Sequence, residues 1–309
     1  MAPLLLESEG IMTHWRTQLD EKKILIVDGA WGTELMNRGM NPQEVPEAWN
    51  VDRPEEIYSV ALSYVNAAAD IILTNTFGGS PLKLAKRGLA EKSAEINRLG
   101  AELSKKAASG RALVFGSIGP TGELIKPLGA ATETELIKGF AEQAKALAAG
   151  GADGIVIETM MDLAEAKAAL RAVKENTPLS VAVTMTFSKA GLNYATLMGV
   201  RPQQAAAELE RAGADIVGAN CGAGIDLMIE VARLMRPTTS LPIWCKPNAG
   251  LPELIDGKTV YRESPEKMAS RFGELLEAGA NMIGGCCGST PAHIRALVLE
   301  RNRLFFGRT

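Results

Sequence analysis

Three cysteines are the residues of this 309-residue chain whose type and spacing best suit chemistry. Cys221 lies in the segment GANCG, and Cys286 and Cys287 are adjacent in GGCCGSTP. Three thiolates at about 2.3 Å from one ion would form a soft, anionic zinc site with a fourth position open. Alternatively, these are small buried side chains, and the glycines only form a tight turn. Spacing alone leaves both interpretations open, whereas a disulfide between adjacent cysteines would be strained.

The adjacent pair can reach one ion only where the backbone departs from a regular strand. Successive side chains of a strand point to opposite faces, so Cys286 and Cys287 would otherwise diverge. Gly284, Gly285 and Gly288 flank the pair and permit an irregular path. The sequence therefore allows both thiols to face the same point.

The elements that must position these thiols are short apolar strands that alternate with helices. A helical stretch, a small-residue turn, an Asp or Asn and a β-branched run recur four times, at 67–73, 150–157, 212–217 and 278–283. Glycine is favoured just after a helix because it adopts the left-handed conformation there. Continuous runs of Ile, Val and Leu indicate parallel strands that are covered on both faces.

Eight such strands predict an α/β fold, a (β/α)8 TIM barrel in a single domain. We expect residues 1–20 to form an N-terminal arm and residues 21–309 to form the barrel, which needs about 250 residues. An amphipathic pattern predicts a helix over 161–174. The strands are expected near 24–28, 71–75, 113–117, 154–158, 181–186, 215–219, 242–246 and 282–285.

The composition excludes several classes of protein. The chain is 46% hydrophobic and 22% charged, a balance typical of globular proteins and not of disordered chains or disulfide scaffolds. Its net charge of −3 is spread without blocks of one sign, so nucleic acid is not an expected partner. No apolar run reaches the roughly 18–20 residues of a spanning helix, so we expect no membrane association. The N-terminus lacks the pattern of an export signal, which predicts a cytoplasmic protein with reduced thiols.

Polar side chains gather where the predicted strands end. Asp28, Glu158, Asn220 and Asn248 follow apolar runs directly or closely, as the three cysteines do. TIM-barrel enzymes carry their active sites at this carboxyl end of the strands, so we expect the functional site there. The chain has only two histidines for acid–base work, which disfavours a zinc hydrolase.

Seven segments resemble the motifs of one known family, in order along residues 20–300. They are DGAWGTE (28–34), TNTFGGS (74–80), GSIGPTGE (116–123), IETMMD (157–162), GANCG (218–222), KPNAG (246–250) and GGCCGSTP (284–291). The chain resembles the homocysteine S-methyltransferase family, and within it most closely the homocysteine-binding domain of cobalamin-dependent methionine synthase. The resemblance implies a (β/α)8 barrel with Zn²⁺ held by Cys221, Cys286 and Cys287. It also implies that homocysteine takes the fourth position as a thiolate.

The resemblance assigns expected roles to further residues. Glu158 matches the carboxylate that binds the amino group of the substrate, and Asp28 is similarly placed to meet that ammonium. Asn248 offers a neutral oxygen that can fill the open metal position before the substrate arrives. The pocket is expected to be lined by Thr76, Phe77 and Ser117.

Three features depart from a simple transfer of family properties. Gly78 stands where betaine-using members carry a tyrosine, which places a betaine donor in doubt. The 191–202 stretch lacks the wording common in methionine synthases, so its role is not assigned. No Asp-x-His-x-x-Gly cobalamin motif occurs, so we expect this chain to bind no cobalamin itself and any corrinoid to belong to a separate protein.

These features predict a zinc-dependent thiol S-methyltransferase that converts homocysteine to methionine. The methyl donor would be a separate corrinoid protein or a small methyl-sulfonium compound. A second hypothesis reverses the direction and passes a methyl group from a donor to a corrinoid protein. A third is a non-catalytic barrel whose structural zinc is closed by Cys245 as a fourth ligand, although Cys245 is better explained as a buried strand residue.

Overall fold

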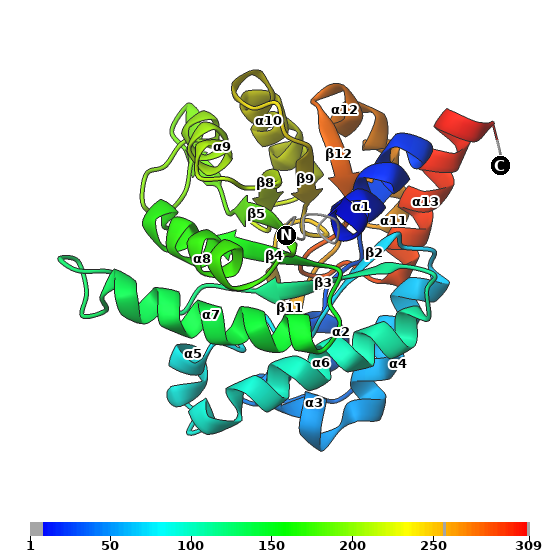
Figure 1. Cartoon of the computed structure of the whole chain (residues 1–309). Coiled ribbons are helices and arrows are strands. Elements are labelled where there is room, and N and C mark those ends of the chain that lie inside the picture. The colour runs from blue at the N-terminus through cyan, green and yellow to red at the C-terminus, as the bar shows by residue number, and fades with distance from the viewer. Residues whose placement is uncertain (1–8, 256–257, 308–309) are drawn as a thin grey trace, which may run out of the picture.

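The computed structural model describes residues 9–255 and 258–307, and its centre is a ring of eight parallel strands surrounded by helices (Figure 1). A main-chain bridge between Val27 and Ile71 joins the two edge strands of the sheet and closes the ring. The predicted (β/α)8 barrel is therefore confirmed, with a strand at each of the eight expected positions. In their order around the ring, the strands are β1 (Leu25–Ile26), β12 (Ala280–Ile283), β9 (Ile243–Lys246), β8 (Ile216–Asn220), β5 (Ser180–Met185), β4 (Gly154–Met160), β3 (Leu113–Ile118) and β2 (Ile71–Leu73).

Helices cover the outside of the ring between successive strands. The segment predicted as a helix over 161–174 forms α8 (Leu163–Asn176), whose N-cap is Asp162. The other helices are α1 (Glu9–Lys22), α2 (Gly32–Asn37), α3 (Trp49–Asp52), α4 (Pro54–Asn66), α5 (Pro81–Ala85), α6 (Ser93–Ala108), α7 (Glu133–Ala149), α9 (Pro202–Arg211), α10 (Ile225–Met235), α11 (Pro265–Ser270), α12 (Phe272–Glu277) and α13 (Pro291–Phe306), with short 3-10 turns at Pro46–Ala48, Ala90–Lys92 and Arg236–Thr238.

The barrel interior is filled by side chains from alternate strand positions. Because neighbouring residues of a strand face opposite sides, one set points inward and the other packs beneath the helices. The inward set includes a cluster of apolar residues, in which the Phe115 and Trp244 rings from β3 and β9 lie 5.7 Å apart between centroids. The residues of this apolar cluster are Leu25, Val27, Ile71, Leu73, Leu113, Phe115, Val156, Ala182, Ile216, Trp244 and Met282.

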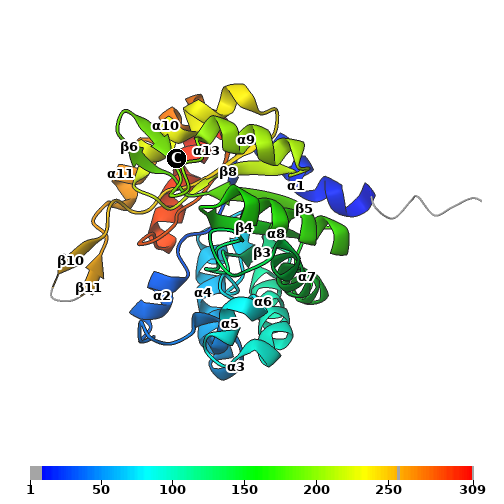
Figure 2. The ribbon, with the colours of Figure 1, turned by 90° about the vertical axis from the view of Figure 1, so that its left-hand side faces the viewer.

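Helix α1 covers the amino end of the strands, which we call the base of the barrel. Trp15 of α1 is only 1% exposed and packs into the same cluster as the inward strand residues. Figure 2 shows α1 and the β10–β11 hairpin on opposite sides of the barrel. The expected arm over 1–20 thus contains most of a helix that ends at Lys22, and residues 1–8 lie outside the described part of the chain.

The Asp or Asn of the fourfold sequence repeat has one role at the base. Each side chain accepts a hydrogen bond from a backbone N–H at the start of the neighbouring strand, and so fixes the register between two strands. The pairs are Asp70 with Ile26 (2.7 Å), Asp153 with Val114 (2.8 Å), Asp215 with Val181 (2.8 Å) and Asn281 with Ile243 (3.0 Å).

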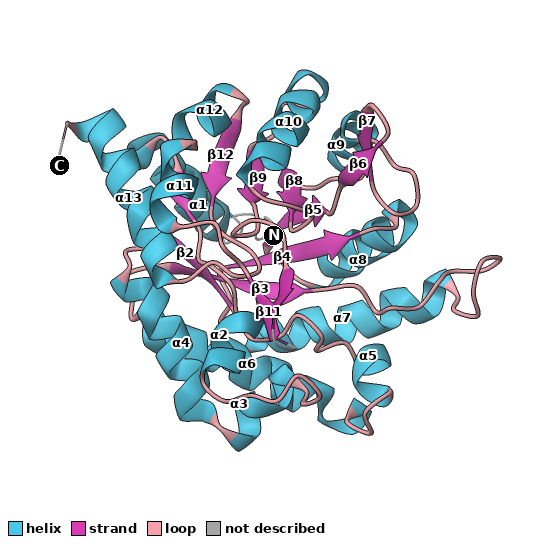
Figure 3. Cartoon of the chain, turned by 180° about the vertical axis from the view of Figure 1, so that it is seen from behind, coloured by secondary structure: helices cyan, strands magenta, loops and turns pink. Residues whose placement is uncertain are grey.

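Two antiparallel hairpins extend the loops at the carboxyl end of the strands, which we call the mouth (Figures 2 and 3). The first, β6 (Ser188–Ala190) and β7 (Asn193–Ala195), follows β5 and includes the start of the unassigned 191–202 stretch. The second, β10 (Glu253–Ile255) and β11 (Lys258–Val260), follows β9. Within residues 9–255 and 258–307, no helix combines the length and the apolar character needed to span a membrane.

Candidate active site

The three predicted thiols meet at the mouth because the ends of β8, β9 and β12 are tied to one another. The Cys221 N–H donates to the Lys246 carbonyl at 3.0 Å, which links the end of β8 to the end of β9. The Cys286 N–H donates to the Pro247 carbonyl at 2.7 Å, and the Cys287 carbonyl accepts from the Ala249 N–H at 2.9 Å. The segment after β9 therefore lies between the two cysteine segments and holds both.

The backbone leaves its strands at the points that the sequence suggested. Cys221 and Gly222 both have positive φ, 61° and 75°, and the first is unusual for a residue with a side chain. Gly288, at φ 79°, lies directly under Tyr261, and a Cβ there would be 2.2 Å from the tyrosine ring. Backbone conformations of this kind concentrate at functional sites, where the surroundings hold them in place.

The cluster geometry fits one zinc ion. The Cys221 sulfur is 3.4 Å from the Cys286 sulfur and 3.7 Å from the Cys287 sulfur, and all three lie within 4.8 Å of one another. Tetrahedral zinc with bonds of about 2.3 Å to sulfur would set its sulfurs about 3.8 Å apart. All four cysteines are free thiols, and the three in the cluster are partly exposed to the mouth.

The three thiols also share protons unequally. Hydrogen bonds from Cys221 and Cys286, together with one from the Tyr261 hydroxyl, lower the pKa of the Cys287 thiol to about 3. Hydrogen bonding with Cys286 and Cys287 raises the pKa of the Cys221 thiol above the ordinary thiol range. One thiolate is thus already favoured in the cluster, and a cation placed among the sulfurs would favour the others.

Asn220 contacts Cys286 and is itself held in place by hydrogen bonds. Its amide nitrogen lies 3.7 Å from the Cys286 sulfur and 2.7 Å from the Thr159 hydroxyl. Its amide oxygen accepts from the Thr159 N–H and the Thr184 hydroxyl at 2.8 and 2.7 Å. All the polar atoms of this side chain have partners, so its orientation relative to Cys286 is set.

Glu158 lies near the end of β4 and faces the same mouth. Its carboxylate is 8% exposed and accepts one hydrogen bond, from the Ser117 hydroxyl at 2.6 Å. Burial raises the pKa of Glu158 to about 7, although the nearby Lys246 ammonium opposes this rise. A carboxylate with one partner and a raised pKa can accept a further cationic donor.

Asp28 is in a different state. One of its oxygens accepts from the Lys246 ammonium at 2.7 Å, and the other accepts from the Trp31 indole at 3.0 Å and the Leu73 N–H at 2.7 Å. Asp28 is fully buried and the Lys246 side chain is 2% exposed. The two form a buried ion pair at the end of β9 and β1.

The remaining predicted residues are Asn248, in the segment after β9, and Thr76 and Phe77, in the segment after β2. Asn248 is 5% exposed, and its buried side-chain oxygen has no hydrogen-bond partner among residues 9–255 and 258–307, which fits a group that awaits a ligand. Thr76 is buried and donates to the Ser117 carbonyl at 2.7 Å. Phe77 packs its ring against Gly119, with the Lys83 ammonium 4.7 Å from the ring centroid.

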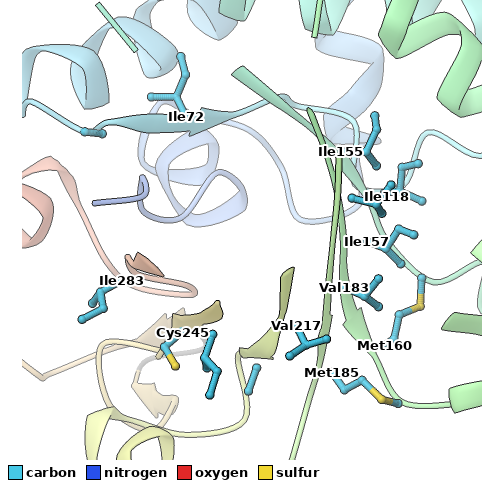
Figure 4. Close-up of a cluster of buried hydrophobic side chains, with 14 of the residues drawn as sticks. Ile72, Ile118, Ile155, Ile157, Met160, Val183, Met185, Val217, Cys245 and Ile283 are labelled. Atoms are coloured by element: carbon cyan, nitrogen blue, oxygen red, sulfur yellow. The ribbon is translucent and has the colours of Figure 1, made fainter. Parts of the chain in front are cut away.

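Cys245 lies outside the cluster. It is fully buried among apolar side chains such as Val217 and Ile283, on the helix-facing side of β9 (Figure 4). Burial raises the pKa of this thiol above the ordinary range, which keeps it protonated. The neighbouring Trp244 points the other way, into the barrel interior. This placement argues against Cys245 as a fourth ligand.

A cleft of about 630 Å³ lies between the β6–β7 hairpin and α10, and none of the three cysteines is among the residues that line it. Gly222 and Ala223, which follow Cys221, form one wall, and the β6–β7 hairpin contributes Lys189 and Tyr194 to another. The unassigned 191–202 stretch therefore contributes Tyr194 to this cleft.

The sequence did not lead us to predict a role in the site for two residues, Lys246 and Tyr261. A signal for Lys246 was present, because a charged residue ends the otherwise apolar PIWCK strand at the mouth. No comparable signal marks Tyr261, because it reaches Cys287 only through the fold of the segment that follows the β10–β11 hairpin.

Comparison with known proteins agrees with this geometry. A family model described as homocysteine S-methyltransferase matches residues 25–300. Methionine synthases from Mycobacterium leprae and Mycobacterium tuberculosis are 31% and 30% identical to the chain, and each alignment covers 89% of it. The chain spans about a quarter of the length of these two relatives, 24% in each case.

A solved structure extends the likeness to the fold as a whole. The homocysteine methyltransferase MmuM from Escherichia coli, in its metallated form, matches with a TM-score of 0.77 and 26% identity. The match covers 91% of this chain and 98% of MmuM. The chain therefore belongs to the homocysteine S-methyltransferase family.

Proposed function

We propose that this chain is a zinc-dependent methyltransferase that methylates the thiol of homocysteine to form methionine. The observation that carries the proposal is the cluster of Cys221, Cys286 and Cys287, whose sulfurs lie within 4.8 Å of one another at the mouth of the barrel. MmuM, with the same fold, is a homocysteine methyltransferase whose structure was solved in a metallated form.

The three cysteines would hold Zn²⁺ and leave one position open toward the mouth. An alkyl thiol, with a pKa of about 8.5, is mostly protonated at neutral pH, and zinc in this position would supply a deprotonated, electron-rich sulfur. Asn220 keeps Cys286 oriented, and the Tyr261 hydroxyl bonds Cys287. Since the cluster needs reduced thiols, we propose that the protein works in the cytoplasm.

Two polar groups would meet the substrate and the metal. Glu158 would receive the substrate ammonium through the oxygen that Ser117 does not use, and Asp28, paired with Lys246, would lie at the same end of the pocket. The unpartnered oxygen of Asn248 would fill the open zinc position before the thiol arrives. Thr76, Phe77 and Ser117 would line the pocket.

Methyl transfer would form one bond and break one. The thiol loses its proton, its sulfur forms a bond to the methyl carbon, and the bond between methyl and donor breaks with its electron pair left on the donor. The donor would be a methyl-corrinoid on a separate protein or a small methyl-sulfonium.

Zinc K-edge absorption spectroscopy with and without homocysteine tests the proposal. We expect three sulfur neighbours and one oxygen or nitrogen neighbour before homocysteine is added, and four sulfur neighbours afterwards. Four sulfurs in the absence of substrate would point to a structural site and overturn the proposal.

A donor assay then separates the direction of transfer. Purified protein is given homocysteine with a methylated corrinoid protein or with a methyl-sulfonium, and methionine is measured. If no donor yields methionine while the corrinoid protein becomes methylated from a small donor, the chain transfers methyl groups to corrinoid instead.

A further inference from the structure

The two carboxylates at the mouth differ in how many hydrogen bonds they can still accept. Asp28 already accepts three, from Lys246, Trp31 and Leu73. Among residues 9–255 and 258–307, Glu158 accepts a side-chain or backbone hydrogen bond only from Ser117. A substrate ammonium can therefore add a bond to Glu158 without displacing a partner, whereas the acceptor position left on Asp28 belongs to the oxygen that the Lys246 ammonium already binds.

The competitor at Asp28 is itself an ammonium. Lys246 ends β9 with its side chain 2% exposed and its nitrogen 2.7 Å from Asp28. Burial lowers the pKa of Lys246, but the Asp28 and Glu158 carboxylates and Cys286 raise it by more, so its pKa lies above the ordinary value. A charge at this depth is retained only when it is paired, so Lys246 and Asp28 depend on each other.

We propose that Lys246 determines the substrate specificity of this site: its ammonium occupies Asp28, so that only Glu158 recognises the amino group of a thiol substrate. This inference rests on the proposed thiol-binding function. It follows that the site also takes thiols that carry a carboxylate but no amino group, a wider class than a site with two free carboxylates would accept.

The test measures the binding of two thiols to zinc-loaded protein by calorimetry, with no methyl donor present. Homocysteine and 4-mercaptobutanoate differ by the amino group alone, so the ratio of their dissociation constants reports its recognition. One charged hydrogen bond is worth roughly ten- to a hundredfold in binding. We expect 4-mercaptobutanoate to bind the wild type within about a hundredfold of homocysteine.

Three variants locate the group that recognises the ammonium. Glu158→Gln should bring the ratio close to one. Lys246→Met frees Asp28 and should raise the preference for homocysteine by about tenfold or more. The double variant Asp28→Asn with Lys246→Met removes both charges of the pair and should keep the wild-type ratio within about threefold.

The double variant keeps the inference falsifiable if Lys246→Met alone does not fold. A ratio near one in the double variant would show that Asp28 receives the ammonium in the wild type, which overturns the inference. An unchanged ratio in folded Lys246→Met would also overturn it. Lys174→Met is a matched control, because Lys174 pairs with Asp215 at 2.6 Å at the base, and it should leave the ratio unchanged.

The same experiment separates this inference from the proposed function. If the zinc-loaded wild type binds neither thiol, both the proposed function and the inference that rests on it are wrong. If homocysteine binds but 4-mercaptobutanoate binds more than about a thousandfold more weakly, the proposed function stands and the role of Lys246 is wrong.

Discussion

The base and the mouth of this barrel use similar polar residues in opposite ways. At the base, Asp70 accepts from the Ile26 N–H, from Lys22 at 2.6 Å and from Arg301, so its carboxylate is saturated. At the mouth, the described residues give the Asn248 oxygen no hydrogen-bond partner and Glu158 one. The difference shows the separate roles of the two ends of a TIM barrel. Hydrogen-bonded polar groups at the base hold the strands together, and polar groups with free acceptor positions at the mouth remain available to a ligand.

Replacing Cys221 by serine should have the largest effect and should act only at the mouth. The loss of one of three sulfur ligands should lower zinc affinity by at least about a hundredfold, as judged by competition with a chelator. The unfolding free energy of the metal-free protein should change by less than about 1 kcal/mol.

Cys245→Ser is the matched control for that prediction. It should keep one zinc per chain but destabilise the fold by about 1–3 kcal/mol, because a hydroxyl replaces a thiol among apolar side chains. If zinc were lost from Cys245→Ser and kept in Cys221→Ser, the assignment of the ligands would be wrong.

Asp70→Ala should show the reverse pattern at the base. Removing this carboxylate leaves Arg301, which is 8% exposed, without its partner, and should cost about 3–5 kcal/mol in urea unfolding. Zinc content should stay at one per folded chain. Lys22→Met, which removes the 35% exposed partner, should cost only about 0–1 kcal/mol. Equal losses in the two variants would contradict the special role of the buried pair.

Asn248→Ala should have a smaller effect that depends on the substrate. Without thiol, the zinc affinity should fall on the order of tenfold, because the fourth position loses its neutral oxygen. With saturating homocysteine, the affinity should equal that of the wild type, since the substrate sulfur takes that position. A loss of the same size in both conditions would instead assign Asn248 a structural role.

The smallest expected effect is a pH dependence carried by Glu158. Burial raises its pKa to about 7, so the carboxylate becomes protonated, and loses its charge, as the pH falls through 7. Homocysteine affinity relative to 4-mercaptobutanoate should therefore fall about threefold between pH 7.5 and 6.5. Glu158→Gln should make this relative affinity independent of pH, and a rise toward low pH in the wild type would exclude Glu158 as the ammonium site.

Much of the base could be predicted because its signals are local. The repeated Asp or Asn before each β-branched run located four strands, and the structure shows that each such side chain bonds the neighbouring strand. The thiol cluster was predictable for a related reason, because strand order in a barrel brings β8 and β12 near one another on either side of β9. The strand order therefore brings Cys221 close to Cys286 and Cys287, although they are far apart in the sequence.

The amino-acid sequence by itself determined the barrel and the location of its strands, because the hydrophobic period and the helix-stop residues lie within short segments. Cysteine spacing alone left the metal site open, and the resemblance to the family motifs identified the three thiols. Only the tertiary structure decided which carboxylate at the mouth is free. Lys246 and Asp28 are 218 residues apart, and nothing local to either announces their bond. The contact arises from closure of the ring, which brings the first strand and β9 to neighbouring positions around β12.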